Sequence, residues 1–433
     1  MLNGMRPGCR PAGARLAVAC LAVLLAGCSS SAVARTADRP PAESATGPIT
    51  FATGKVDTGY LQPLISRWNA SHPTQRVSPI YLPDDANDQY AQLVANLQAH
   101  SSVYDVMSLD VIWTAEFASN GWIAPLSGSS LPLSQFLRPA VETAMYQGHL
   151  YAVPFTSNAE LLYYRTDILA AAHLSPPQTW AQLANDAMIA GSRFNLDGYG
   201  GQFQSYEGLT VNFAEAVQSA GGSLLSAAGP AVDTPQASQA LSFLVSGFRA
   251  GWIPAAALNW NEEASRRAFE AGTLVFLANW PYVYGDASVP GPGNVVAGKF
   301  GVTTLPGLHG PGSATLGGAN LAISAYSRHP ATALAFIKFL TSAASERFIL
   351  LRSALPPVWT SLYSQPSLVA KFPFLPVLEQ AILTAKPRPA LVDYNQFSLA
   401  ISSTVHEALA QRISVQAALT QLSGELRQIL RAG

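Results

Sequence analysis

The chain has 433 residues, of which 49% are hydrophobic and only 12% are charged, and its formal net charge is −1. This length predicts two domains, at roughly 100–200 residues for each domain. The seven histidines include no pair at the i, i+4 spacing of zinc-binding helices, so neither a metal site nor another cofactor is expected.

The first 28 residues have the pattern of a bacterial lipoprotein signal peptide. Arg6, Arg10 and Arg15 precede an apolar stretch over residues 16–26. This stretch is too short to span a bilayer, because a transmembrane helix needs about 20 residues. Cys28 follows directly after Leu-Ala-Gly. We therefore expect residues 1–27 to be removed and Cys28 to carry the lipid that holds the protein on the outer face of the cell membrane. The alternative is an ordinary cleaved signal with an incidental cysteine.

The mature chain would be mildly acidic and almost free of cysteine. The removed segment holds three arginines and no acid, which leaves a formal charge of −4 and argues against nucleic acid as a partner. Cys9 and Cys20 lie in that segment, so no disulfide is expected. Residues 28–48 are small, polar and proline-bearing, and this composition predicts a flexible tether.

From Ile49 onward, short apolar runs alternate with helical patterns, which predicts an α/β fold with parallel sheets. Asp110 and Trp113 follow the third predicted strand, where ligands of such sheets are bound. The alternatives are that Asp110 caps the next helix and that Trp113 belongs to the core. The sequence predicts strands at 49–52, 77–81 and 103–107, and helices at 61–69, 90–99, 206–220, 331–340 and from 415 onward.

Six blocks of sequence carry a resemblance that extends over nearly the whole mature chain. They are residues 105–126, 151–165, 262–272, 279–281, 317–323 and 388–389. In this order they resemble the extracellular sugar-binding proteins of ABC importers, family 1 of the solute-binding proteins, and most of all the mycobacterial trehalose-binding lipoproteins. The joint order of the blocks is more specific than any single block.

The resemblance implies the two-lobed fold of type II periplasmic binding proteins, which is maltose-binding-protein-like, with the ligand in the cleft between two α/β lobes. The N-terminal lobe is expected at 49–157 plus 313–355, and the C-terminal lobe at 158–312 plus 356–433. Crossings between the lobes are expected near 157–158, 311–313 and 355–357. Rotation at a few residues of such crossings would close the lobes as rigid bodies.

A sugar presents hydroxyls, which carboxylates and amides bind with directed hydrogen bonds, and apolar C–H faces, which aromatic rings cover. By resemblance, Asp110 and Asn158 would bind hydroxyls of one glucose, Trp280 would stack on a ring, and the glycines would allow close backbone approach. The residues carried over are Asp110, Asn158, Glu263, Trp280, Gly317, Gly318 and Arg388, with Glu263 and Arg388 as charged partners. Weaker candidates are Asp57, Glu207 and Trp113, and a polar group of Gln204, Tyr206, Glu207 and Asn212.

Each assignment has a simpler competitor. Trp280 could be a core aromatic, and Arg388 could be a solvated charge in a proline-rich loop. Glu263 could serve only as a first-turn acid of a helix, and Gly317 with Gly318 could form an ordinary turn.

The expected function is capture of a disaccharide, with trehalose favoured, and its delivery to membrane permease subunits driven by a cytoplasmic ATPase. The protein is expected to be a monomer. Paired carboxylates such as Glu262 with Glu263 could suggest a glycosidase, but the sequence lacks the usual hydrolase motifs and we expect no enzyme. The alternatives are a maltose-like oligosaccharide or a glycerophospho compound as ligand, or a surface lipoprotein without a role in transport.

Overall fold

The computed structural model describes residues 44–55 and 58–432. The predicted signal peptide, most of the tether, Cys28 and Asp57 lie outside the described residues. The described residues belong to one compact unit, and the fold described below is that of this unit. Within the described part of the chain, no helix combines the length and apolar character that crossing a membrane needs.

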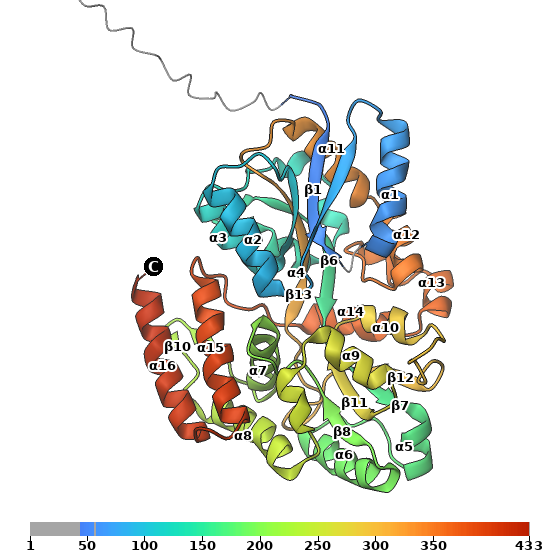
Figure 1. Ribbon diagram of the computed structural model, residues 1–433, viewed down its shortest axis with the longest axis vertical. Helices are drawn as coiled ribbons and strands as arrows, with labels where there is room; N and C mark the ends of the chain where they lie inside the picture. The colour runs from blue at the N-terminus through green and yellow to red at the C-terminus, as the bar shows by residue number, and fades with distance from the viewer. Residues whose placement is uncertain (1–43, 56–57, 433) are drawn as a thin grey trace, which may run out of the picture. The chain divides into compact units, whose positions relative to one another are not determined.

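Five strands form the first sheet, in the order β2-β1-β3-β13-β6 (Figure 1). The predicted parallel arrangement holds for β1 with β2 and with β3, but β13 is antiparallel to both β3 and β6. The sheet is mixed because no helix lies between β13 and the strand that precedes it in the chain, which belongs to the second sheet. The strands are β1 (Ile49–Gly54), β2 (Val77–Leu82), β3 (Val106–Asp110), β6 (Ala152–Ala159) and β13 (Leu316–Ile323).

The third strand begins three residues later than predicted. The buried carboxylate of Asp105 accepts hydrogen bonds from the Thr50 backbone N–H at 2.8 Å and from the Ser327 hydroxyl at 2.6 Å. Asp105 thus joins neighbouring segments through its side chain, and the strand pairing begins at Val106. The strand β3 ends at Asp110.

Apolar spacing explains the helices beside the first sheet. In α1, Leu61, Leu64, Ile65 and Trp68 recur at helical intervals and are at most 3% exposed. In α2, Asp85 caps the first turn by accepting from two backbone N–H groups. The helices of this part are α1 (Thr58–Ser71), α2 (Ala86–Gln98), α3 (Thr114–Ser119), α4 (Arg138–Thr143), α11 (Pro330–Leu340) and α12 (Ala343–Ser353).

The second sheet has four strands in the order β12-β7-β11-β8. They are β12 (Phe300–Thr303), β7 (Leu161–Arg165), β11 (Leu274–Asn279) and β8 (Asp197–Gly200). The helices that follow or precede them are α5 (Thr166–Ala172), α6 (Trp180–Phe194), α7 (Glu207–Ser219), α8 (Pro235–Ala250), α9 (Glu262–Glu270) and α10 (Tyr282–Ala287). The two sheets with their helices form two α/β lobes.

Of the C-terminal helices, α15 packs on α7 and α16 packs on α8 in the second lobe, whereas α14 contacts β6 of the first sheet (Figure 1). These helices are α13 (Pro366–Lys371), α14 (Leu375–Thr384), α15 (Tyr394–Leu409) and α16 (Val415–Ala432). Two short strand pairs lie outside the main sheets, β4 (Met145–Tyr146) with β5 (His149–Leu150) and β9 (Leu225–Ser226) with β10 (Gly229–Pro230).

Three segments pass between the lobes side by side. Glu160 alone separates β6 of the first sheet from β7 of the second. Opposite it, Leu316 pairs with Ala159, and the Leu316 N–H donates to the Lys386 carbonyl at 2.8 Å. The Lys386 N–H donates to the Ala314 carbonyl at 2.9 Å, which ties the third segment to the second. The exact lobe boundaries given above stay a prediction.

Candidate functional site

A cavity of about 440 Å³ lies where residues of both lobes meet, within the size range of small-molecule sites. Its lining brings together residues that are far apart in the sequence. All seven residues carried over from the resemblance line it, namely Asp110, Asn158, Glu263, Trp280, Gly317, Gly318 and Arg388, and Glu207 lines it as well.

Two glycines of β13 shape one wall of this cavity. Gly317 pairs with Asn158 of β6, and a Cβ atom added to Gly317 would lie 2.7 Å from the Trp280 ring. Gly318 has a φ of +125°, which side chains rarely adopt. The two residues belong to a strand, so the interpretation as an ordinary turn is wrong. The missing side chain of Gly317 leaves the space that the Trp280 ring occupies.

Trp280 follows the last residue of β11 and is only partly buried. Its backbone N–H donates to the Asn279 side-chain oxygen at 2.7 Å, and its carbonyl accepts from the Tyr163 hydroxyl at 3.0 Å. These two hydrogen bonds fix the backbone of Trp280. With its ring against Gly317 and on the lining of the cavity, Trp280 is not a plain core aromatic.

The first turn of α9 supplies an acidic edge. Asn261 caps the helix, and Glu262 accepts from the Tyr206 hydroxyl at 2.6 Å. Glu263 accepts from the Tyr282 hydroxyl at 2.7 Å and forms an ion pair with Arg266 at 2.6 Å. The two carboxylates are thus oriented by different partners, beyond the role of first-turn acids.

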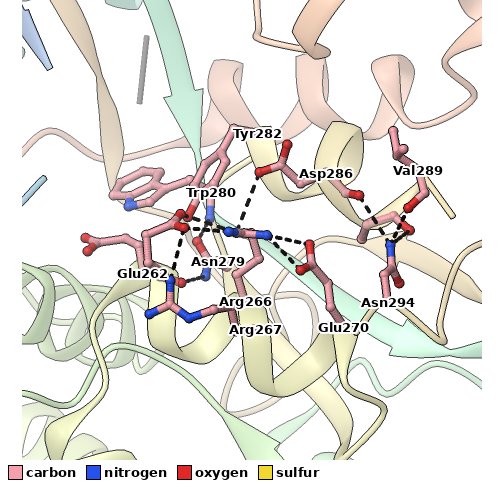
Figure 2. Close-up of polar contacts among 12 residues, drawn as sticks. Glu262, Arg266, Arg267, Glu270, Asn279, Trp280, Tyr282, Asp286, Val289 and Asn294 are labelled. Carbon is pink, nitrogen blue, oxygen red and sulfur yellow. Dashed lines mark hydrogen bonds and ion pairs between the residues drawn. The ribbon is translucent and has the colours of Figure 1, made fainter. Parts of the chain in front are cut away.

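Arg266 is itself surrounded by acids, and Figure 2 shows its guanidinium between Glu270 and Asp286. Burial by itself would raise the pKa of Glu263, but hydrogen bonds from Arg266 and Tyr282 outweigh burial and hold that pKa below its usual range. Burial raises the pKa of Glu262, and its hydrogen bond from Tyr206 offsets this only in part. The edge therefore carries one firmly ionised carboxylate beside one that holds its proton more readily.

Arg388 forms a buried bridge between the lobes. Its side chain is 2% exposed, Nη2 donates to Asp110 Oδ1 at 2.7 Å, and Nη1 donates to Glu207 Oε1 at 2.5 Å. Burial alone would lower the pKa of Arg388, but the charges of Asp110, Tyr394 and Glu207 raise it well above its ordinary value. Arg388 is a fixed cation that joins the end of β3 to the start of α7, and the interpretation as a solvated charge is wrong.

Glu207 forms two further side-chain contacts at the start of α7. It accepts from the Tyr394 hydroxyl at 2.6 Å and from the Ser398 hydroxyl, both on α15. Burial raises the pKa of Glu207, and the neighbouring Arg388 charge counteracts part of that rise. Within the polar group predicted around this helix, Glu207 lines the cavity and Tyr206 orients Glu262, whereas Asn212 donates to Gln202 away from it.

Asp110 and Asn158 retain capacity for a ligand. Asp110 Oδ1 accepts from the Ile112 N–H at 3.1 Å and so also caps the short 3-10 helix Val111–Trp113, yet its side chain is 22% exposed. The side-chain oxygen of Asn158 is buried and has no hydrogen-bond partner within the described part of the chain. An unpaired buried acceptor is costly, so a ligand hydroxyl that donates to it would be favoured.

Trp113 does not line the cavity. Its ring is 5% exposed and packs against the rings of Tyr90 and Phe117, with centroids 5.8 and 6.3 Å away. Trp113 therefore belongs to the core, as the simpler interpretation held, because the short helix after Asp110 turns its ring under α2 and α3.

Several lining residues escaped the sequence interpretation. Tyr282 lies two residues after Trp280 (Figure 2), just beyond the proline that precedes α10, and its hydroxyl donates to Glu263. The sequence could have indicated Tyr282, because a second aromatic residue two positions after a predicted stacking tryptophan is itself a candidate lining residue. Other missed lining residues include Tyr60, Asp84, Ser108, Phe155, Asn261, Glu262 and Asp286. In the described ranges, no cluster of three or more His, Cys, Asp or Glu side chains is arranged to hold a metal ion.

Known proteins match this chain over most of its length. The family model of the bacterial extracellular solute-binding proteins matches residues 53–347. A Deinococcus radiodurans relative, a probable ABC transporter-binding protein, is 33% identical over 399 residues, covering 89% of this chain and 94% of its own. The mannitol-binding protein of Pseudomonas aeruginosa is 26% identical over 364 residues, covering 78% and 80%.

The solved structure of maltose-bound MalE3 from T. maritima is similar with a TM-score of 0.84 and 31% identity, covering 88% of this chain and 99% of that one. This similarity confirms the predicted two-lobed, maltose-binding-protein-like α/β fold.

Proposed function

Because this chain belongs to the family of bacterial extracellular solute-binding proteins, we propose that it captures a disaccharide, with trehalose favoured, in the cavity between its lobes. As the substrate-binding protein of an ABC sugar importer, it acts outside the cytoplasm and works with permease and ATPase subunits. The preference for trehalose rests on the resemblance of the sequence blocks. Anchoring through lipidated Cys28 and a monomeric state are parts of the same proposal.

One observation carries the assignment to a sugar. The Trp280 ring lies against Gly317, and Gly317 pairs across the strands with Asn158, whose buried side-chain oxygen is unpaired. An aromatic face therefore lies beside a directed acceptor. A pyranose ring needs both, because its C–H face is apolar and its hydroxyls are hydrogen-bond donors and acceptors.

Capture by closure follows from where the lining residues lie. Asp110 and Asn158 belong to strands of the first sheet, and Glu263 and Trp280 belong to the second lobe. A ligand shifts an open–closed equilibrium only by its difference in affinity for the two states. A sugar that contacts both lobes would bind the closed state more tightly, and the segments crossing at Glu160, Thr315 and Lys386 would serve as the hinge.

We assign no catalysis to the paired carboxylates. Solute-binding proteins are not enzymes, and Glu262 and Glu263 are each engaged by a tyrosine hydroxyl rather than held as a free acid and nucleophile. Two other ligands keep specific support. Maltose is the ligand bound to the similar MalE3 structure, and mannitol is named for the Pseudomonas relative.

Calorimetric titration tests the proposal. The protein from Arg35 onward, refolded to remove carried-over sugar, is titrated with trehalose, maltose, sucrose, mannitol and glycerophosphocholine. We expect saturable one-to-one binding of trehalose. Binding of maltose or mannitol alone would change the assigned ligand and leave the assigned function of solute capture in place. The absence of any heat of binding with all the sugars and the polyol would contradict the proposal.

Two tryptophan variants separate binding from folding. Trp280→Ala should weaken sugar binding at least ~10-fold, because a stacked aromatic ring contributes on the order of 1 kcal/mol beyond its buried area. Trp359→Ala is the control, since Trp359 packs on Phe136 and donates to the Thr341 carbonyl, and it does not line the cavity. The control should lose thermal stability and keep its affinity.

A further inference from the structure

We propose that the cavity rejects anionic ligands and that Glu207 is the specificity-determining residue, because its carboxylate cancels the charge of Arg388 before any ligand arrives. This inference rests on the proposed function for the role of the cavity as the ligand site. It narrows the proposed ligands to neutral sugars and polyols and excludes solutes that carry a phosphate.

The charges on the cavity lining are strongly unbalanced. Arg388 is the one basic residue of the described lining. The acidic residues of the lining are Asp84, Asp110, Glu207, Glu262, Glu263 and Asp286. An entering phosphate would therefore depend on Arg388 for any favourable charge contact.

Arg388 has little capacity left for such a contact. Nη2 is 2.7 Å from one oxygen of Asp110, and Nη1 lies 2.5 Å from Glu207 and 3.4 Å from the second oxygen of Asp110. The planar guanidinium recognises phosphate by presenting a free pair of donors, and both outer nitrogens are occupied here. The third nitrogen, Nε, has no partner within the described residues, but it is buried and does not form a free pair with an unoccupied outer nitrogen. Two carboxylates around one guanidinium also leave a local net negative charge. An anion would have to displace a carboxylate that is already buried.

Arg266, which pairs with the lining residue Glu263, offers no substitute. It does not line the cavity, and it forms ion pairs with Glu263 at 2.6 Å, Glu270 at 2.7 Å and Asp286 at 3.6 Å. Lys386, two residues before Arg388, lines a different cavity of about 950 Å³.

Glu207, rather than Asp110, determines the selection against anions, because side chains of the protein already bind its carboxylate. Its side chain is 10% exposed and it is bound by Tyr394 and Ser398 in addition to Arg388. Asp110 is more open to the cavity and is the proposed sugar contact. A glutamine at 207 keeps the shape of the side chain and one acceptor oxygen, and its NH2 group can donate to the hydroxyl that loses its acceptor. Glu207→Gln therefore removes the charge with a small change in hydrogen bonding.

The test compares glycerol 3-phosphate with trehalose by calorimetry, for the unaltered protein and for Glu207→Gln. We expect the ratio of affinities, glycerol 3-phosphate over trehalose, to rise at least ~10-fold in the variant, because removing one of two carboxylates restores net attraction between Arg388 and an anion. Glu142→Gln is the matched control: it removes one negative charge from an exposed ion pair with Arg138 and should leave the ratio unchanged.

The outcomes are distinguishable. Binding of glycerol 3-phosphate by the unaltered protein as tightly as trehalose would overturn the charge selection, as would equal ratios for Glu207→Gln and the control. If the unaltered protein binds no sugar, the proposed function fails, yet a gain of glycerol 3-phosphate or inorganic phosphate binding in Glu207→Gln would still support the selection, and no gain would overturn it.

A second measurement needs no variant. If net repulsion excludes the anion, raising the salt concentration should leave glycerol 3-phosphate unbound or strengthen its weak binding to the unaltered protein. Tight binding that weakens with salt would reveal a net attractive site and would overturn the proposal, even if Glu207→Gln failed to fold.

Discussion

Two pairs of carboxylates lie near the meeting of the lobes, all of them buried except the partly exposed Asp110, and the two pairs differ in how their charge is compensated. Asp110 and Glu207 share the guanidinium of Arg388. Glu160 and Glu215 are 1% and 4% exposed and have no basic partner among the described ion pairs. A cation allows both carboxylates of a buried pair to stay ionised, whereas a pair without one must retain a proton.

The second pair lies at the crossing between the lobes. Glu215 accepts from the Thr315 N–H at 2.9 Å, and Thr315 precedes the residue that pairs with Ala159, next to Glu160. Burial raises the pKa of Glu160 well above its usual range, and the charges of Glu215 and Glu262 add to this. Burial also raises the pKa of Glu215 to about 8, although Thr315, Glu160 and Arg388 act against that rise. At neutral pH the Glu215 carboxyl therefore holds a proton, and burial favours the protonated form of Glu160 as well.

The largest expected effect comes from removing the cation of the first pair. Arg388→Met should destabilise the protein by about 3–5 kcal/mol, because the buried Glu207 would be left beside the partly exposed Asp110 without a compensating cation. Urea-induced unfolding at pH 7 measures this change. A decrease of less than ~1 kcal/mol in the free energy of unfolding would show that the two carboxylates do not need the cation. The proposed difference in charge compensation between the two pairs would then be wrong.

The second prediction removes the ionisable carboxyl of Glu215. Glu215 in the folded protein has a pKa of about 8, against an ordinary value of 4.5. The stability linked to it is therefore fully present below pH ~4.5 and is lost as the pH rises through 8. Glu215→Gln should be more stable than the unaltered protein by ~2–3 kcal/mol at pH 9, within the ceiling of about 5 kcal/mol that ~1.4 kcal/mol per pH unit allows.

Denaturant unfolding between pH 4.5 and 9 checks this pH dependence. The ionisable groups that face the pair include Tyr163, Tyr199, Glu262 and Arg388, and all of them remain in the variant. Glu407→Gln, at a surface ion pair with Arg412, is the control and should follow the unaltered curve. Parallel curves for Glu215→Gln and the unaltered protein would mean that Glu215 titrates normally.

The third prediction sharpens the role of neighbours in the first pair. Tyr394→Phe removes the hydroxyl that donates to Glu207 at 2.6 Å and keeps the ring. A hydrogen bond to a buried charged group contributes ~1.5 kcal/mol, so we expect a loss of that size in thermal or urea unfolding. No loss would show that Arg388 and Ser398 alone satisfy Glu207.

The smallest effect is expected at an exposed ion pair. Arg138 and Glu142 lie 2.8 Å apart on α4 with side chains 89% and 63% exposed. Arg138→Met should change the free energy of unfolding by less than ~0.5 kcal/mol, because water and salt screen the pair. A loss comparable to that of Arg388→Met would show that burial does not separate the two ion pairs.

Local patterns predicted much of this fold because they depend on neighbours in sequence. The apolar spacing of Leu61, Leu64 and Ile65 fixes one buried helix face, and the predicted strand at 77–81 differs from β2 by one residue. The joint order of sequence blocks also named Asp110, Asn158 and Trp280, which the structure brings to one cavity. Their role as ligand contacts stays a prediction.

What the sequence determined by itself was therefore the type of most elements and a set of residues for the cleft. Only the tertiary structure decided how charges are compensated. Arg388 is bound by Asp110, 278 residues away, and by Glu207, 181 residues away, while the Glu215 carboxyl meets Thr315 across 100 residues. No local pattern encodes such contacts, because the burial and the partner that set each charge exist only once the lobes have packed.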